Sequence, residues 1–237
     1  MRVSYKSGFT LVEMAVVLVI LALMLGGLLI PISAQMDQQR YTETRKSLEE
    51  IKEALMGYAL THGYLPCPAK LSSDGLESRT GTSCTNRVGH LPWAELGVGK
   101  HDAWNHLFRY SVTPVYSDSD PIKKITISPP MSRDITILTR DSSGAQKNFS
   151  NLNDIPVVIM SMGKNGAWAY SDDGVSVADV SATNIDEDVN GNGNGKIFFS
   201  RIYTENKTIT GGEFDDIVVW ISPNVYINRM VSAGQLP

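Results

Sequence analysis

The pattern of apolar and charged positions begins with a long apolar segment near the N-terminus. Residues 14–36 carry no charged side chain, and the short stretch before them contains the basic residues Arg2 and Lys6. About 20 apolar residues are enough for a helix to cross the hydrocarbon core of a bilayer, and basic flanking residues stay on the cytoplasmic side. The pattern therefore predicts a membrane-spanning helix over residues 9–36, with its N-terminus in the cytoplasm.

The next segment, residues 37–62, is charged but keeps one apolar stripe. The apolar residues of this stripe recur at the spacing of one helix face: Leu48, Ile51, Leu55 and Tyr58. Such spacing predicts an amphipathic helix with one buried face, and Gly63 is a suitable C-terminal stop. We therefore expect a single helix over residues 9–62, about 80 Å long at 1.5 Å per residue.

The remainder of the chain, residues 63–237, alternates short apolar runs with stretches rich in Gly, Pro, Ser, Asp and Asn. Apolar runs between turn-forming residues predict strands. These runs are residues 108–116, 124–128, 133–139, 156–161, 196–204 and 217–222. Ser222 followed by Pro223 predicts the start of a short helix over residues 224–233. We therefore predict an α+β fold, in which a long N-terminal spine helix, transmembrane in its first half, packs against a mostly antiparallel β-sheet head.

The chain contains two cysteines, Cys67 and Cys84, and both follow the predicted membrane span. A head outside the cytoplasm lies in an oxidising environment, where such a pair forms a disulfide. Closing a loop of about 17 residues would stabilise the fold by about 3 kcal/mol on the chain-entropy account. The alternative is a pair of free, buried thiols.

Composition argues against two large classes of function. The net charge of −4 does not suit a dedicated nucleic-acid binder, because binding to phosphates requires a basic surface. No Ser/His/Asp order, nucleophile elbow or phosphate-binding glycine loop stands out in the sequence. We therefore expect neither a specific nucleic-acid partner nor an enzyme.

Glu13 is the most informative residue in the N-terminal segment. A carboxylate in an apolar helix costs a few kcal/mol in lipid unless it is neutral or paired. Cleavage of the chain after Gly8 would create a new α-amino group on Phe9. That cation could pair with Glu13 of a neighbouring subunit and set the axial register of one helix against the next.

Residues 6–13 resemble the class III signal of type IV prepilins and type II secretion pseudopilins. The shared features are a short basic leader that ends in Gly8, then Phe9, then Thr10-Leu11, and a glutamate at the fifth residue of the mature chain, which is Glu13. The resemblance implies that prepilin peptidase removes residues 1–8 and that Phe9 is methylated. It also implies assembly through Phe9 and Glu13 by an inner-membrane assembly platform.

The resemblance implies a structural subunit of a helical filament, with other pilin or pseudopilin subunits as its partners. The subunit would lie in the bacterial inner membrane, in contact with lipid, before assembly, and in a periplasmic or extracellular filament afterwards. The large head favours a minor pilin, and a type II secretion pseudopilin is the alternative. A different class, a membrane-anchored binding protein that never polymerises, would retain Met1 and tolerate loss of Glu13.

An acidic run in the head predicts a Ca²⁺ site. Oxygen-bearing side chains occupy alternate positions at Asp186, Asp188, Asn190 and Asn192, as in the first half of a calcium loop. The twelfth position is Ile197 and not a glutamate, so a closing carboxylate would come from Asp215 or Asp216. Pseudopilins contain structural Ca²⁺ in a C-terminal loop, and the resemblance extends that expectation to this chain. The alternative is a solvated turn without metal.

Overall fold

The computed structural model describes residues 8–120, 134–149 and 154–236, and for residues 25–32 it describes the backbone alone. The leader residues Arg2 and Lys6 and the predicted strand 124–128 lie outside the described residues. The chain divides into two compact units, Met1–Thr42 and Glu43–Pro237.

The first described element is a single long helix, α1 (Leu11–His62), which confirms the predicted helix with a start two residues later. Where side chains are described, no helix has both the length and the apolar character that a membrane crossing requires. The predicted span of residues 9–36 includes residues 25–32, whose side chains lie outside the described part.

In the second unit, α1 has the predicted buried face. Its fully buried apolar side chains, each at most 2% exposed, are Leu48, Ile51, Leu55, Met56 and Ala59. Tyr58, which belongs to the same predicted stripe, is half-buried. The helix ends at His62. The next residue, Gly63, has a φ of 85°, a left-handed conformation that residues with a Cβ atom rarely adopt. Gly63 therefore ends the helix as expected.

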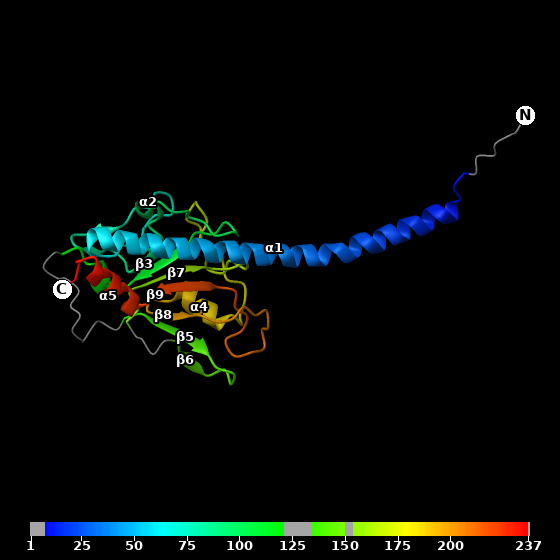
Figure 1. Ribbon diagram of the computed structural model, residues 1–237. Coiled ribbons are helices and arrows are strands. Elements are labelled where there is room, and N and C mark those ends of the chain that lie inside the picture. The colour runs from blue at the N-terminus through cyan, green and yellow to red at the C-terminus, as the bar shows by residue number, and fades with distance from the viewer. Residues whose placement is uncertain (1–7, 121–133, 150–153, 237) are drawn as a thin grey trace, which may run out of the picture. The chain divides into compact units, whose positions relative to one another are not determined.

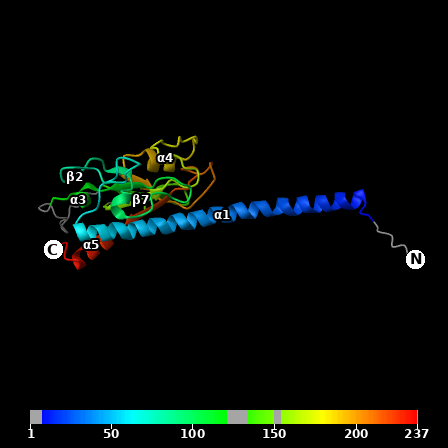
Figure 2. The same ribbon diagram turned by 90° about the horizontal axis from the view of Figure 1, so that it is seen from above.

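A four-stranded antiparallel sheet forms the centre of the head (Figure 1). Its strands, in spatial order, are β3 (Val88–His90), β4 (Arg109–Val112), β7 (Val157–Ser161) and β9 (Ile217–Ile221). Residues 43–62 of α1 lie along one face of this sheet, with α5 (Pro223–Ser232) beside them (Figures 1 and 2). All residues of β7 are buried. Because alternate side chains of a strand point to opposite faces of the sheet, β7 packs against a hydrophobic core on both faces.

A second sheet of three strands covers part of the opposite face. It contains β5 (Thr136–Arg140), β6 (Gln146–Asn148) and β8 (Ile197–Phe199) in the order β6-β5-β8. The pair β5–β8 is parallel, so the prediction of a mostly antiparallel head is confirmed with one exception. The core between the two sheets includes Ile137, Val158, Met160 and Phe198.

The remaining elements are short. The strands β1 (Arg79–Thr80) and β2 (Ser83–Cys84) pair in a two-stranded ribbon. Three further helices are α2 (Trp93–Leu96), α3 (Pro114–Ser117) and α4 (Ile185–Asn192). The predicted closing helix is α5, with Pro223 in its first turn, but the Ser222 side chain makes no capping hydrogen bond. The predicted strand 108–116 is shorter than expected, because Pro114 starts α3 instead.

The predicted disulfide is confirmed. Cys67 and Cys84 are bonded to each other, and Cys67 is fully buried. The bond links the segment after α1 to the ribbon strand β2, so it closes a loop that has little regular structure of its own. Cross-linking such a loop restricts the unfolded chain more than the folded one.

Candidate assembly motif and acidic cluster

The start of α1 is organised around Thr10 and Glu13. The backbone N–H of Thr10 and its hydroxyl both donate to Glu13 Oε2, each at 2.9 Å, and the backbone N–H of Glu13 donates to Thr10 Oγ1 at 3.2 Å. This reciprocal arrangement is a capping box, which satisfies backbone donors that a helix start leaves free. The signal for it in the sequence is a threonine followed three residues later by a glutamate, a pattern typical of a helix start.

Gly8 and Phe9 precede the helix in an exposed, irregular segment. A Cβ atom placed on Gly8 would meet no other atom within 4 Å, so the chain itself leaves room for a larger residue there. Phe9 is 85% exposed. Both residues are therefore accessible to an external partner.

Apolar side chains are exposed on all sides of the first part of α1. They include Leu11 at 91%, Val12 at 71%, Leu18 at 62% and Leu23 at 73%. A helix that is apolar all round is normally buried in a protein core or in lipid, and large exposed apolar surfaces mark interaction sites. This part of α1 is therefore suited to contact lipid, other helices, or both.

The head contains a second candidate site, a cluster of the carboxyl groups of Glu187, Asp215 and Asp216. One carboxylate oxygen from each residue lies within 4.8 Å of the other two. Glu187 comes from α4, whereas the two aspartates immediately precede β9. Glu187 is 1% exposed and Asp216 is 7% exposed, so the cluster is shielded from water.

The structure places the predicted calcium ligands differently from expectation. The run forms α4, and side chains two positions apart on a helix point about 200° apart, so Asp186, Asp188, Asn190 and Asn192 cannot converge on one ion as they would in a loop. Asp186 pairs with two arginines, Asp188 accepts a hydrogen bond from Trp168 Nε1 at 2.9 Å, and Asn192 is exposed.

Two of the predicted ligands, Asp215 and Asp216, do belong to the cluster, and Asn190 touches it. Asn190 Nδ2 donates to Asp216 Oδ2 at 2.8 Å. Glu187 is the member that sequence reasoning missed. It was inside the acidic run, but its position between the expected ligands excluded it from the calcium-loop pattern.

Hydrogen bonds hold the cluster in place but leave one oxygen free. Glu187 Oε1 accepts from the backbone N–H of Asp215 at 2.6 Å, and Glu187 Oε2 accepts from Asn165 Nδ2 at 2.9 Å and Asn184 Nδ2 at 3.1 Å. Asp215 Oδ2 accepts from the backbone N–H of Asn165 at 2.7 Å. Asp215 Oδ1 is buried and has no hydrogen-bond partner among the described residues.

The electrostatics of the cluster disfavour three negative charges. Burial, and then the charge of Glu187, raise the pKa of Asp215 to about 7, and burial together with Glu187 raises the pKa of Asp216 well above its usual value. Such a group of carboxyls needs either bound protons or a cation. The three carboxylates match the ligands that hard cations prefer, and they supply part of the six to eight oxygens that Ca²⁺ takes.

One comparison with known proteins gives a match. The family model for the prokaryotic N-terminal methylation motif matches residues 3–29. The match includes Gly8, Phe9 and Glu13 and the first part of α1, and it supports a type IV pilin-like or pseudopilin family. A motif of this kind implies a membrane-anchored, pilin-type precursor. Neither the curated proteins nor the solved structures contain a match to the chain.

Proposed function

We propose that the chain is a structural subunit of a type IV pilus-like filament. The observation that carries the proposal is the methylation motif at residues 3–29, together with the exposed apolar side chains on all sides of the first part of α1. Before assembly, residues 9–36 would span the inner membrane and contact lipid. After assembly, the same side chains would contact the helices of neighbouring subunits.

Within this proposal, Gly8 serves processing and Phe9 and Glu13 serve assembly. Prepilin peptidase would cleave the Gly8–Phe9 bond, which lies in an exposed segment, and the new amino group of Phe9 would be methylated. That amino group would pair with Glu13 of a neighbour. The capping box shows that the Glu13 carboxylate lies at the very start of α1, within a short distance along the chain of the amino group that cleavage would create.

We favour a minor pilin over a type II secretion pseudopilin because the head, residues 63–237, is large and has long irregular connections. The pseudopilin alternative is favoured by the acidic cluster, since calcium sites occur in that group. The abundance of the subunit separates a minor pilin from a major one, because a major subunit dominates sheared filaments.

Substitution of Gly8 by alanine tests the processing step. A Cβ at this position would contact nothing within the chain, so Gly8→Ala should leave folding and membrane insertion unchanged while cleavage is lost. The measurement is the mass of the N-terminal peptide from natively expressed protein. The wild type should begin at methylated Phe9 and the variant at Met1.

Gly99→Ala is a matched control, because a Cβ at Gly99 also meets no atom within 4 Å and Gly99 lies far along the chain in the head. It should be processed like the wild type. A wild-type peptide that begins at Met1, in cells with active prepilin peptidase, would contradict the proposed function and favour an anchored binding protein.

For the head, we propose that the acidic cluster of Glu187, Asp215 and Asp216 binds a structural Ca²⁺ ion. Three observations support it: the convergence of three carboxylates within 4.8 Å, their burial, and the free Oδ1 atom of Asp215. The ion would balance the buried negative charge and hold the segment before β9 against α4.

Thermal unfolding at two pH values tests this proposal. The folded-state pKa of Asp215, about 7, lies above its usual value, so this group stabilises the fold below roughly pH 4 and loses that contribution as the pH rises to 7. Without cation, the melting temperature should therefore fall over this range. Ca²⁺ should restore it at pH 8 and have little effect at pH 5, where protons compete.

In the Asp215→Asn variant, the melting temperature should lose most of its pH dependence and most of its response to Ca²⁺, because one of the repelling charges is removed. Asp141→Asn is a suitable control, since Asp141 titrates outside the cluster, with a pKa lowered to about 2 chiefly by the Ser143 hydroxyl. If Ca²⁺ left the melting temperature of the wild type unchanged at pH 8, the calcium proposal would be wrong.

A further inference from the structure

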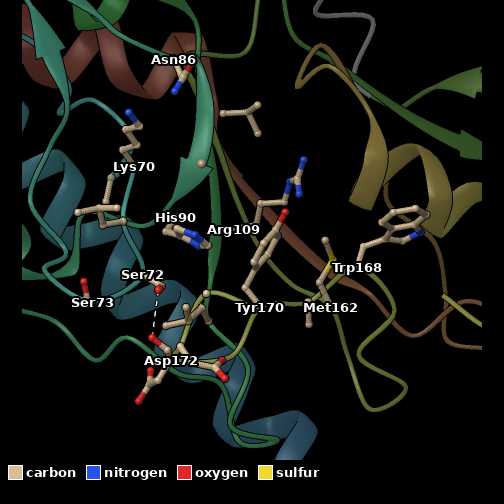
Figure 3. A pocket seen from close by; sticks show the side chains of 18 residues that line it. Lys70, Ser72, Ser73, Asn86, His90, Arg109, Met162, Trp168, Tyr170 and Asp172 are labelled. Atoms are coloured by element: carbon tan, nitrogen blue, oxygen red, sulfur yellow. Dashed lines mark hydrogen bonds between the residues drawn. The ribbon is translucent and has the colours of Figure 1, made fainter. Parts of the chain in front are cut away.

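A pocket of about 610 Å³ opens on the side of the head formed by β3 and β4 (Figure 3). Loop residues 69–73 and 168–174 complete its walls. This volume lies within the range of small-molecule sites, which is about 300–1,000 Å³. Neither the filament motif nor the acidic cluster assigns a role to this pocket.

Arg109 on β4 extends into the middle of the pocket, where it lies beside Tyr170 (Figure 3). The residue is half-buried, and its Nε atom is buried without a hydrogen-bond partner among the described residues. Burial lowers the pKa of Arg109, which reflects the cost of holding its charge away from water. Asp216 attracts this charge only through space.

Other arginines of the head have carboxylate partners. Arg79 pairs with Glu77, Arg87 with Asp134, and Arg229 with Glu53. A buried charge without a partner destabilises a fold. Among these arginines, Arg109 is the exception: it is half-buried and Asp216 attracts its charge only through space, so its guanidinium is available to an anionic ligand.

Two aromatic side chains line the same pocket. The Tyr170 ring packs edge to face on His90, with ring centroids 5.0 Å apart. Trp168 has a φ of 64°, a left-handed conformation that is strained for a bulky residue and is common at binding sites. A hydrogen bond from its Nε1 atom to Asp188 Oδ1 holds it there. The pocket therefore combines a cation with rigid aromatic surfaces.

The rim of the pocket is polar. The side chains of Lys70 and Asn86 are exposed, line the pocket and point toward each other in Figure 3. Burial lowers the pKa of His90, so Lys70 and Arg109 supply the positive charge of the lining. Asp172 and Asp173 also line the pocket, and Asp172 is paired with Lys100 and His101. Exposed donors around an aromatic wall can bind the hydroxyl groups of a ligand whose ring packs against that wall.

We propose that this pocket binds a sugar that carries a carboxylate group. The carboxylate would accept hydrogen bonds from the guanidinium of Arg109, because a planar guanidinium can donate two parallel hydrogen bonds to a carboxylate. The sugar ring would pack on Tyr170 and its hydroxyls would bind the side chains of Lys70 and Asn86. The proposal does not depend on filament assembly, because every residue that it uses lies in the second compact unit.

Ligand titrations of the full-length chain in detergent micelles, followed by calorimetry, test the proposal. The probes are D-glucuronate, an acid common in polysaccharides of bacteria and plants, and N-acetylneuraminate, an acid of animal cell-surface glycans. Methyl glucoside is the neutral control and acetate is the control for a bare anion. At least one acidic sugar should bind ten times more tightly than either control, and the better one identifies the source.

Equal binding of acetate and the acidic sugars would overturn the proposal, and so would an absence of binding by both acids. The Arg109→Met variant adds a second readout. It should abolish binding of the acidic sugar and leave the melting temperature nearly unchanged, because methionine keeps much of the apolar packing of the arginine stem.

A clear fall in the melting temperature of Arg109→Met would show that Arg109 serves the fold, and the proposal would be wrong. Arg229→Met is the matched control, because Arg229 is an exposed arginine outside the pocket. It should bind the sugar like the wild type. Calorimetry and melting temperature together thus separate a binding arginine from a structural one.

Discussion

Replacement of Glu13 by alanine is expected to keep the subunit out of filaments while the chain is still inserted in the membrane and processed. After cleavage, Phe9 would carry a positive amino group inside an apolar environment. An unpaired charge costs about 2.5–3.5 kcal/mol at the centre of a membrane helix and less near its ends, and each 1.4 kcal/mol corresponds to a tenfold change in an equilibrium. Incorporation of Glu13→Ala should therefore fall about tenfold.

Glu13→Gln separates the two roles that the structure gives this residue. Glutamine can complete a capping box with Thr10, but it carries no charge to pair with the amino group of a neighbour. If charge pairing drives assembly, Glu13→Gln should fail like Glu13→Ala. If the capping hydrogen bonds at 2.9 Å are what matters, the glutamine variant should assemble normally.

The measurement is the ratio of the subunit in sheared filaments to the subunit left in membranes, determined for each variant in the same cells. The N-terminal peptide mass must show cleavage at Phe9 in all of them, so that failed processing is not mistaken for failed assembly. Thr10→Val provides the reverse control, since it removes the capping hydroxyl and keeps the carboxylate. Normal assembly of Glu13→Ala would contradict the pairing role.

The parts of the fold that depend on local sequence were predictable. The stripe of Leu48, Ile51 and Leu55 is a property of neighbouring positions on one helix, and these residues are fully buried. Gly63 ends the helix for an equally local reason. The parallel pairing of β5 with β8 could not be read in the same way, because it joins strands about 60 residues apart along the chain.

The candidate sites show the same division. The acidic run was identified, but its geometry depends on whether it forms a loop or a helix and on which distant residues reach it. Arg140 and Arg201 take Asp186 away from any shared ion, and neither arginine is near it in sequence. Likewise, nothing around Arg109 in the sequence indicates that Tyr170 and Trp168 form a pocket with it.

Replacement of Asp186 by alanine is expected to be among the most destabilising single changes in the head. Asp186 is 0% exposed and accepts hydrogen bonds from Arg140 Nε at 2.7 Å and Arg140 Nη2 at 2.6 Å, while Arg201 Nη1 donates to it as well. The side chains of the two arginines are only 12% and 7% exposed. Loss of the carboxylate leaves two largely buried cations together, which should cost about 3–5 kcal/mol.

Chemical denaturation of the full-length chain in detergent measures this loss, and Glu53→Gln is the matched control. Glu53 also pairs with an arginine, Arg229, but at 60% side-chain exposure, so its loss should cost no more than about 1 kcal/mol.

A triple variant, Asp186→Ala with Arg140→Met and Arg201→Met, distinguishes a charge effect from a packing effect. If unpaired cations cause the loss, removing them should recover most of the stability, because apolar side chains of similar volume can replace a buried ion triad at little cost. If the triple variant were as unstable as Asp186→Ala alone, the carboxylate would act by fixing the start of α4 rather than by neutralising charge. A loss below about 1 kcal/mol in Asp186→Ala itself would mean that both guanidinium groups reach water after small side-chain movements.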